Sequence, residues 1–175
     1  LKPDDYESIK DLGNTYQAVG DINTAKNYYQ KAIAINSSYA PALTILGFIE
    51  LTTGNKQDAL SLLIKATESD PQLAPAWGGL TNVYFQLGKT QEAEIACHKA
   101  IELNPNQLNS HFLLGTILLG QKKLQEAEQP LRKTIELKPD FFQAHSALGS
   151  LFGELGNLKE AEISTRKAIE LNPDF

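Results

Sequence analysis

One amino acid returns through this chain every 34 residues, and that period limits what the chain can fold into. Prolines keep one register at Pro3, Pro71, Pro105, Pro139 and Pro173, and only Ser37 breaks the series. Another column of the same period reads Ala25, Ala59, Ala93, Ala127 and Ala161. A fixed period of this size is typical of a solenoid, in which each unit buries its apolar face against its neighbours.

The period divides the chain into a short leading segment and five units. The leading segment is residues 1–5, and the units are 6–39, 40–73, 74–107, 108–141 and 142–175. Leu1-Lys2-Pro3 matches Leu137-Lys138-Pro139, which ends a unit, so we interpret residues 1–5 as the tail of a preceding unit. We therefore expect one continuous array, cut from a longer one, with no C-terminal capping helix.

Each unit shows the pattern of two antiparallel helices. In the fifth unit, apolar residues recur at helical spacing from Leu148 to Leu155, and Gly156 then ends the helix. A second helix follows and ends at Pro173. We expect first helices at about 6–19, 40–53, 74–87, 108–121 and 142–155, and second helices at about 23–36, 57–70, 91–104, 125–138 and 159–172.

The fourth unit departs from this pattern at two places. Lys122 stands where the other units have a glycine at the end of the first helix, namely Gly20, Gly54, Gly88 and Gly156. A left-handed lysine costs about 1–2 kcal/mol, so we expect an altered turn there. Pro130 lies inside the second helix, where it removes one backbone hydrogen bond and is expected to bend the helix.

The third unit carries the residues by which a family is recognised. Trp77, Leu80, Tyr84, Gly88, Ala93, Ala100 and Pro105 together resemble the tetratricopeptide repeat signature, and all five units fit it. The resemblance implies an all-α fold, a right-handed superhelical solenoid of antiparallel helix pairs. It also implies that the first helices line a concave groove, which in this family usually binds an extended peptide or a partner helix.

Composition and charge argue against several other functions. The net charge is −5, whereas a protein that binds nucleic acid needs a basic face. The longest apolar stretch, Phe112–Leu119, is too short to span a bilayer, so we expect no membrane partner and a cytoplasmic location.

No combination of residues indicates catalysis. His111 and His145 occupy one column, but no further metal ligand is evident beside them, so we interpret both as packing groups in the place of Trp77. Cys97 lies in a column that faces the space between helices, and we interpret it as a small buried apolar group. We expect no enzyme activity, no metal and no cofactor.

The concave groove is therefore where we expect the functional residues. Its columns contain the apolar residues Ile45, Phe48, Leu51, Phe85, Phe112 and Leu119, and the polar residues Lys10, Asn14 and Asn82. A contiguous exposed apolar patch on a protein surface usually marks an interface. The alternative is that a tight superhelix partly buries these side chains against neighbouring first helices.

Two binding modes of the family can be tested on these residues. The members that bind chaperone tails clamp a carboxylate with lysine, asparagine and arginine from three first helices. Lys10 and Asn14 match the first pair, but Ile45, Pro75 and Gly79 stand where the other three are needed, so we reject that mode. The asparagine ladder of the O-GlcNAc transferase family is also missing from the corresponding column.

The sequence thus predicts a protein-interaction scaffold that binds a protein or peptide with apolar anchors. Two alternatives remain open. One is an array that recruits substrates for a larger enzyme of the glycosyltransferase or sulfotransferase type. The other is a scaffold that assembles with itself, end to end.

Overall fold

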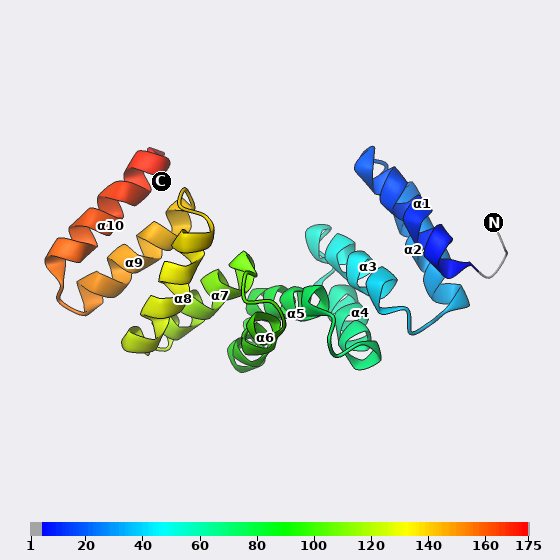
Figure 1. The fold of residues 1–175 in the computed structure, drawn as a ribbon, viewed down its shortest axis with the longest axis horizontal. Coiled ribbons are helices and arrows are strands. Elements are labelled where there is room, and N and C mark those ends of the chain that lie inside the picture. Colours follow the sequence, from blue (N-terminus) through cyan, green and yellow to red (C-terminus); the bar gives the residue numbers. More distant parts are fainter. Residues whose placement is uncertain (1–4, 175) are drawn as a thin grey trace. The chain divides into compact units, whose positions relative to one another are not determined.

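The computed structural model describes residues 5–174, and in this part of the chain every regular element is an α-helix (Figure 1). The first helices are α1 (Tyr6–Ala18), α3 (Ala40–Thr52), α5 (Ala74–Gln86), α7 (Leu108–Gly120) and α9 (Phe142–Glu154). The second helices are α2 (Ile22–Ile35), α4 (Lys56–Ser69), α6 (Thr90–Leu103), α8 (Leu124–Leu137) and α10 (Leu158–Leu171). These bounds confirm the predicted helices to within two residues at each end.

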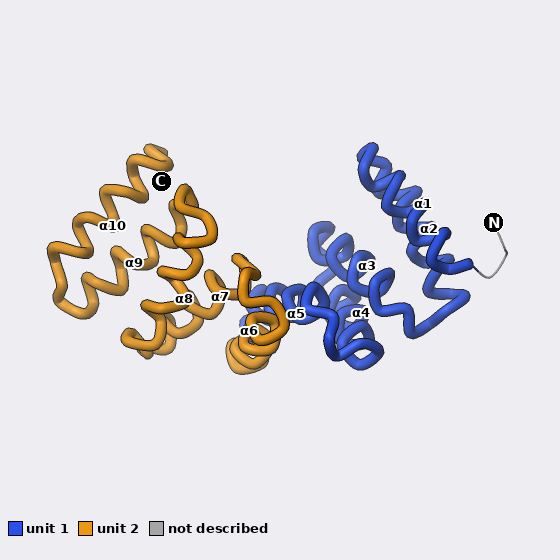
Figure 2. Tube along the Cα trace, viewed as in Figure 1, with its two compact units in different colours: residues 1–89 blue, residues 90–175 orange. Residues whose placement is uncertain are grey.

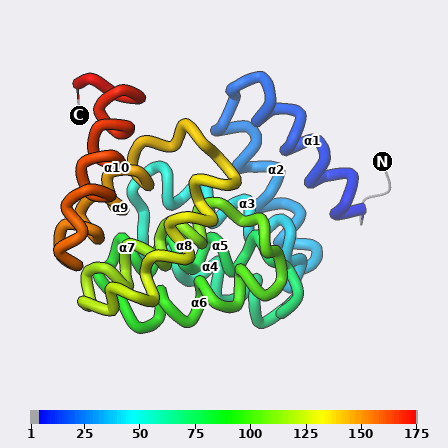
Figure 3. Tube along the Cα trace, turned by 60° about the vertical axis from the view of Figure 1, so that its left-hand side comes forward, coloured from blue at the N-terminus to red at the C-terminus, as the bar shows by residue number. Residues whose placement is uncertain are grey.

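The helices group into two compact units, each larger than one 34-residue repeat. Residues 1–89 form the first unit and residues 90–175 the second unit, and the two are coloured separately in Figure 2. In the first unit α1 packs on α2 and α3 on α4, while α2–α3 and α4–α5 contacts join the pairs. In the second unit α7 packs on α8 and α9 on α10, with α6–α7 and α8–α9 contacts between them. Figure 3 shows α9 and α10 side by side.

Close helix pairing depends on the small residues of the first helices. A Cβ atom placed on Gly47 of α3 would lie 2.8 Å from Leu63 Cγ, and one on Gly79 of α5 would lie 2.6 Å from Leu63 Cδ2. Leu63 of α4 thus packs directly against the backbone of two first helices. Gly115 of α7 leaves the same space for Leu131 of α8.

We predicted an altered turn at Lys122, and this prediction is wrong. Lys122 has a φ of 62°, in the left-handed region that Gly54 and Gly156 also adopt. Its turn is closed by the hydrogen bond from Lys123 N to Leu118 O, at 2.9 Å, as Asn55 N to Glu50 O closes the earlier turn at 2.8 Å. The six-to-one bond of a helix C-terminus therefore forms even with a lysine at the strained position.

Pro130 does not interrupt its helix. α8 runs through it for 14 residues, the same length as α6 and α10. Proline has no N–H, so one backbone hydrogen bond is lost, as predicted from its chemistry. The predicted bend remains a prediction.

The predicted tail of a preceding unit, residues 1–5, lies outside the described residues except for Asp5. The side chain of Asp5 caps α1 by accepting a hydrogen bond from Ser8 N at 3.1 Å.

Candidate functional site

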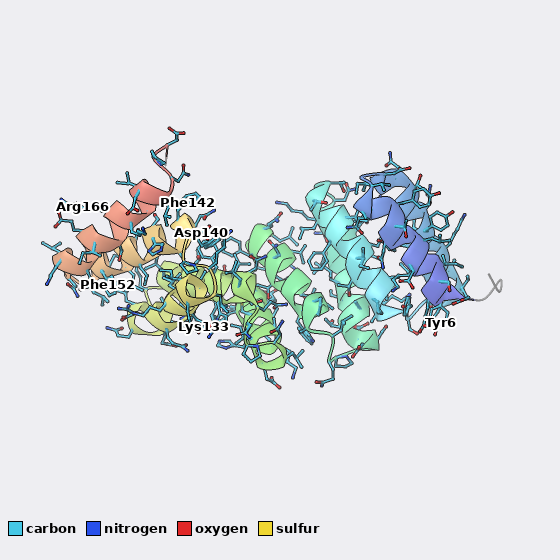
Figure 4. The ribbon with its side chains drawn as sticks, turned by 45° about the horizontal axis from the view of Figure 1, so that its top comes forward. Tyr6, Lys133, Asp140, Phe142, Phe152 and Arg166 are labelled. Carbon is cyan, nitrogen blue, oxygen red and sulfur yellow. The ribbon has the colours of Figure 1, made fainter. Side chains whose placement is uncertain are left out.

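Charge is distributed unequally between the two kinds of helix. α5 and α7 contain no Asp, Glu, Lys or Arg, and α3 contains only Glu50. The second helices carry most of the charge; α8 contains Glu126, Glu128, Arg132, Lys133 and Glu136. Figure 4 labels two charged side chains of the second helices, Lys133 on α8 and Arg166 on α10. The middle first helices therefore present almost uncharged surfaces.

The accessible side of α3 is a narrow stripe of three apolar residues and one threonine. Most of this helix is buried, and the residues that are not form the α3 stripe: Pro41, Ile45, Phe48 and Thr52. Their spacing of three and four residues places them on one face of the helix. Ile45 and Phe48 are each half-buried, so part of each side chain stays available to a ligand.

α5 continues this surface with a more exposed aromatic residue. Phe85 is 39% exposed, and Asn82, one turn earlier, is half-buried. Asn82 Oδ1 accepts a weak hydrogen bond from Gln86 Nε2 at 3.4 Å. Because α3 and α5 contact each other, the first unit brings the predicted residues Ile45, Phe48, Asn82 and Phe85 onto neighbouring helices.

Leu51 is a correction to the predicted site. It was expected to face solvent or a ligand, but it is 7% exposed and belongs to the core. α3 contacts α2, α4 and α5, and most of its residues, Leu51 among them, are buried by this packing. Leu113, in the column of Ile45, is buried as well, so that column is not accessible in α7.

In the second unit, the predicted residues lie on α7, and one of them has a structural partner. Phe112 and Leu119 are half-buried. The Phe112 ring packs edge-on against Phe141, with 5.0 Å between ring centroids and an interplanar angle of 86°. The ammonium group of Lys138 lies 5.7 Å from the Phe141 ring centroid. Phe112 therefore joins the start of α9 to α7 in addition to offering part of its surface.

The accessible side of α1 is polar. Lys10 Nζ lies 2.5 Å from Asp11 Oδ1, and this hydrogen bond raises the pKa of Lys10 above its usual value. Asn14 is exposed and its Nδ2 donates to Asp11 Oδ1 at 3.3 Å. The first unit thus combines a polar helix, α1, with the apolar stripe of α3.

Three ring N–H groups form a repeated contact that the sequence did not predict. Trp77 Nε1 donates to Pro71 O at 3.0 Å, and the Nε2 atoms of His111 and His145 lie 2.8 and 2.9 Å from the carbonyl oxygens of Pro105 and Pro139. A carbonyl oxygen only accepts, so each histidine carries its hydrogen on Nε2. The packing interpretation of both histidines is confirmed. The sequence signal that could have revealed this contact is a tryptophan or histidine six residues after each of these prolines.

The other sequence interpretations concern possible chemistry. Cys97 is completely buried, which confirms its assignment as a core residue. Among the described residues, no group of three or more His, Cys, Asp or Glu side chains is placed to hold a metal ion. No described helix is long and apolar enough to cross a membrane.

Comparison with known families decides the identity of the array. Models of the tetratricopeptide repeat match residues 16–81, 74–107, 96–129 and 142–175. The chain belongs to the tetratricopeptide repeat family. Together the matches extend over most of the chain and include eight of the ten described helices in full, while α1 and α8 are matched only in part. No curated protein sequence matches the chain.

Solved structures with the same fold cover nearly the whole tetratricopeptide array. MamA is 26% identical with a TM-score of 0.80, over 93% of this chain and 95% of MamA. YrrB, a tetratricopeptide repeat protein described as having an unusual peptide-binding site, is 24% identical with a TM-score of 0.82, over 99% of this chain and 89% of YrrB. PilF of Pseudomonas aeruginosa is 19% identical with a TM-score of 0.88, over 99% of this chain and 79% of PilF. The fold class is therefore an all-α tetratricopeptide solenoid, and such arrays are protein-interaction scaffolds.

Proposed function

We propose that this tetratricopeptide array binds an apolar peptide segment, extended or helical, on the first-helix faces of α3 and α5. The observation that carries the proposal is the segregation of charge: α5 has no charged residue, and the only one of α3 is buried. A surface without ionised groups favours uncharged side chains, because a charged ligand group would lose its hydration there without gaining a partner.

Two aromatic residues are the proposed anchor contacts. Phe85 is 39% exposed, although aromatic residues are usually covered, and Phe48 lies in the apolar stripe of the neighbouring α3. Aromatic residues in such positions dominate the free energy of binding at interfaces. Asn82 lies one turn from Phe85 and offers an amide to the peptide main chain. YrrB, which shares the fold, is described as having a peptide-binding site, which agrees with this proposal.

In the first unit, Lys10, Asn14 and Ile45 complete the proposed site, and Leu51 is withdrawn from it because it is buried. In the second unit, Phe112 and Leu119 of α7 are proposed as apolar ligand contacts of that unit by itself. The array is proposed to act without catalysis of its own, by holding a partner.

Selection from random peptides displayed on phage tests this function, followed by affinity measurements on the selected peptides. Phe48→Ser and Phe85→Ser are each expected to weaken binding about tenfold or more, as replaced anchor residues do. Ile95→Ser is the matched control, because Ile95 is 68% exposed but lies on the second helix α6. Loss of binding in the control and not in the two phenylalanine variants would contradict the proposal, as would a selection that yields no peptide.

A further inference from the structure

A polar network in the first unit reaches from the core to the accessible side of α1. Tyr29 of α2 is completely buried, yet its hydroxyl oxygen lies 2.9 Å from Asn14 Oδ1 and 2.7 Å from Gln17 Oε1. Both of these partners are exposed residues of α1. The ring passes α1 at Gly13, where a Cβ atom would lie 2.6 Å from Tyr29 Cε1. Glycine at this position therefore opens the path of the tyrosine to the surface.

The chemistry of the groups fixes the direction of the hydrogen bonds. A hydroxyl group has one hydrogen, so Tyr29 donates to only one of the two amide oxygens. Asn14 Nδ2 already donates to Asp11 Oδ1, which leaves its Oδ1 as the acceptor for Tyr29. The contact with Gln17 is then favourable only when the amide of Gln17 turns its nitrogen toward the hydroxyl. Burial raises the pKa of Tyr29, although the charge of Lys10 opposes this, so the hydroxyl stays protonated at neutral pH.

We infer that Tyr29 is a positioning residue that holds Asn14 and Gln17 as a donor and an acceptor for the main chain of a bound peptide. This arrangement exchanges the Gln17 amide oxygen and nitrogen relative to the 2.7 Å contact, so that Nε2 donates to the hydroxyl and Oε1 is left for a ligand, while Asn14 Nδ2 keeps a second hydrogen. Asn14 and Gln17 are three residues apart and so lie on the same face of the helix. A peptide group carries one N–H and one C=O, which is the complement of this pair.

This inference rests on the proposed function and makes it more specific. The other residues of the Tyr29 column are Leu63, Cys97, Leu131 and Thr165, and none of them carries a hydroxyl as far from its backbone. Recognition of the peptide main chain is therefore assigned to α1, and recognition of its apolar side chains to α3 and α5.

The probe is a phage-selected peptide whose binding depends on Phe48 and Phe85. Tyr29→Phe keeps the ring against Gly13 and removes only the hydroxyl. It is expected to weaken binding about threefold to tenfold, the usual effect of one lost hydrogen bond. Asn14→Ala and Gln17→Ala should each weaken binding similarly. In an Asn14→Ala background, Tyr29→Phe should weaken binding less than it does in the wild type, because only the contact with Gln17 is left for it to remove.

Tyr28→Phe is the matched control, because Tyr28 is the adjacent tyrosine and stacks on Tyr16 at 5.3 Å between ring centroids. It should leave binding unchanged. Ester analogues of the peptide, each lacking one main-chain N–H, should include one whose binding is insensitive to Gln17→Ala. The inference is overturned if the peptide requires Phe48 and Phe85 but binds the Tyr29, Asn14 and Gln17 variants normally. If no selected peptide requires Phe48 or Phe85, the proposed function itself fails and the inference with it.

Discussion

At the scale of single residues, the space left by glycine sets how closely the helices of a pair approach. Gly115 and Gly120 lie on the same helix, α7, but in opposite surroundings. A Cβ on Gly115 would lie 2.6 Å from Leu131 Cγ and 3.3 Å from the Leu131 backbone nitrogen, whereas a Cβ on Gly120 would meet nothing within 4 Å. Alanine substitutions at the two positions therefore distinguish the effect of close packing on stability from the effect of helix propensity.

We predict that Gly115→Ala destabilises the array by about 1–3 kcal/mol, because the added methyl group forces α7 away from α8. Gly120→Ala is the control and should be neutral or stabilising by up to about 1 kcal/mol, since alanine favours the helix. Denaturant unfolding of the two variants measures the difference. Equal effects of the two substitutions would show that Gly115 is not required for packing.

Local features of the sequence predicted the helices and their ends, because glycine turns and apolar spacing act within a few residues. The turn at Lys122 was predicted wrongly, since a left-handed lysine costs only about 1–2 kcal/mol and the hydrogen bonds and packing of the turn outweigh it. Leu51 was assigned wrongly for another reason. Its burial follows from the packing of α3 against other helices, which a column of equivalent residues does not reveal.

At the scale of helices, aromatic and charged contacts join neighbouring pairs. Phe112 of α7 packs on Phe141, which precedes α9. Lys26 of α2 forms an ion pair at 2.5 Å with Glu50 of α3, and Asn55 Nδ2 donates to the same carboxylate at 2.8 Å. In the second unit, Glu94 of α6 accepts hydrogen bonds from Gln121 and Lys123.

Phe112→Ser should therefore lower stability by about 1 kcal/mol or more, because an aromatic pair contributes about 0.5–1.5 kcal/mol beyond its buried area. Phe85→Ser should change stability by no more than about 0.5 kcal/mol, as exposed positions usually do. Thermal melting compares the two variants. If the pair is the cause, Phe112→Ser will cost less in a Phe141→Ala background; an unchanged cost there would refute it.

Acid should weaken the junction between α2 and α3. Burial raises the pKa of Glu50, but the hydrogen bonds from Lys26 and Asn55 and the charge of Lys26 lower it more, so the pKa ends below its ordinary value of 4.5. A carboxylate with a lowered pKa stabilises the fold above the pKa of the unfolded state, and this stabilisation is lost as the pH falls through the folded value.

We therefore expect the melting temperature to fall as the pH drops below about 4.5, and to fall less steeply in Glu50→Gln, which should also be less stable at neutral pH. Glu136→Gln is the control, since Glu136 is 67% exposed and pairs with Lys133 at the surface. Identical pH profiles for the wild type and Glu50→Gln would exclude a role of Glu50 in acid sensitivity.

At the scale of the whole molecule, the 34-residue repeat separates two tasks. The second helices carry most of the ionised groups, whereas the first helices α3, α5 and α7 are nearly uncharged and leave some apolar side chains accessible. The repeat fixed the fold class in advance, because its period and small residues specify helix pairs. The candidate site was predicted less completely. The partial exposure of Phe48 and Phe85 followed from their columns, whereas the Tyr29 network depends on one glycine that lets a side chain cross between helices.

The most direct test of the account is to map where a phage-selected peptide binds, by following the backbone amide resonances of the array during a titration. The account predicts that the largest shifts fall on α3 and α5 around Ile45, Phe48, Asn82 and Phe85, with smaller shifts on α1. Shifts concentrated on the second helices α4, α6, α8 or α10 would contradict it.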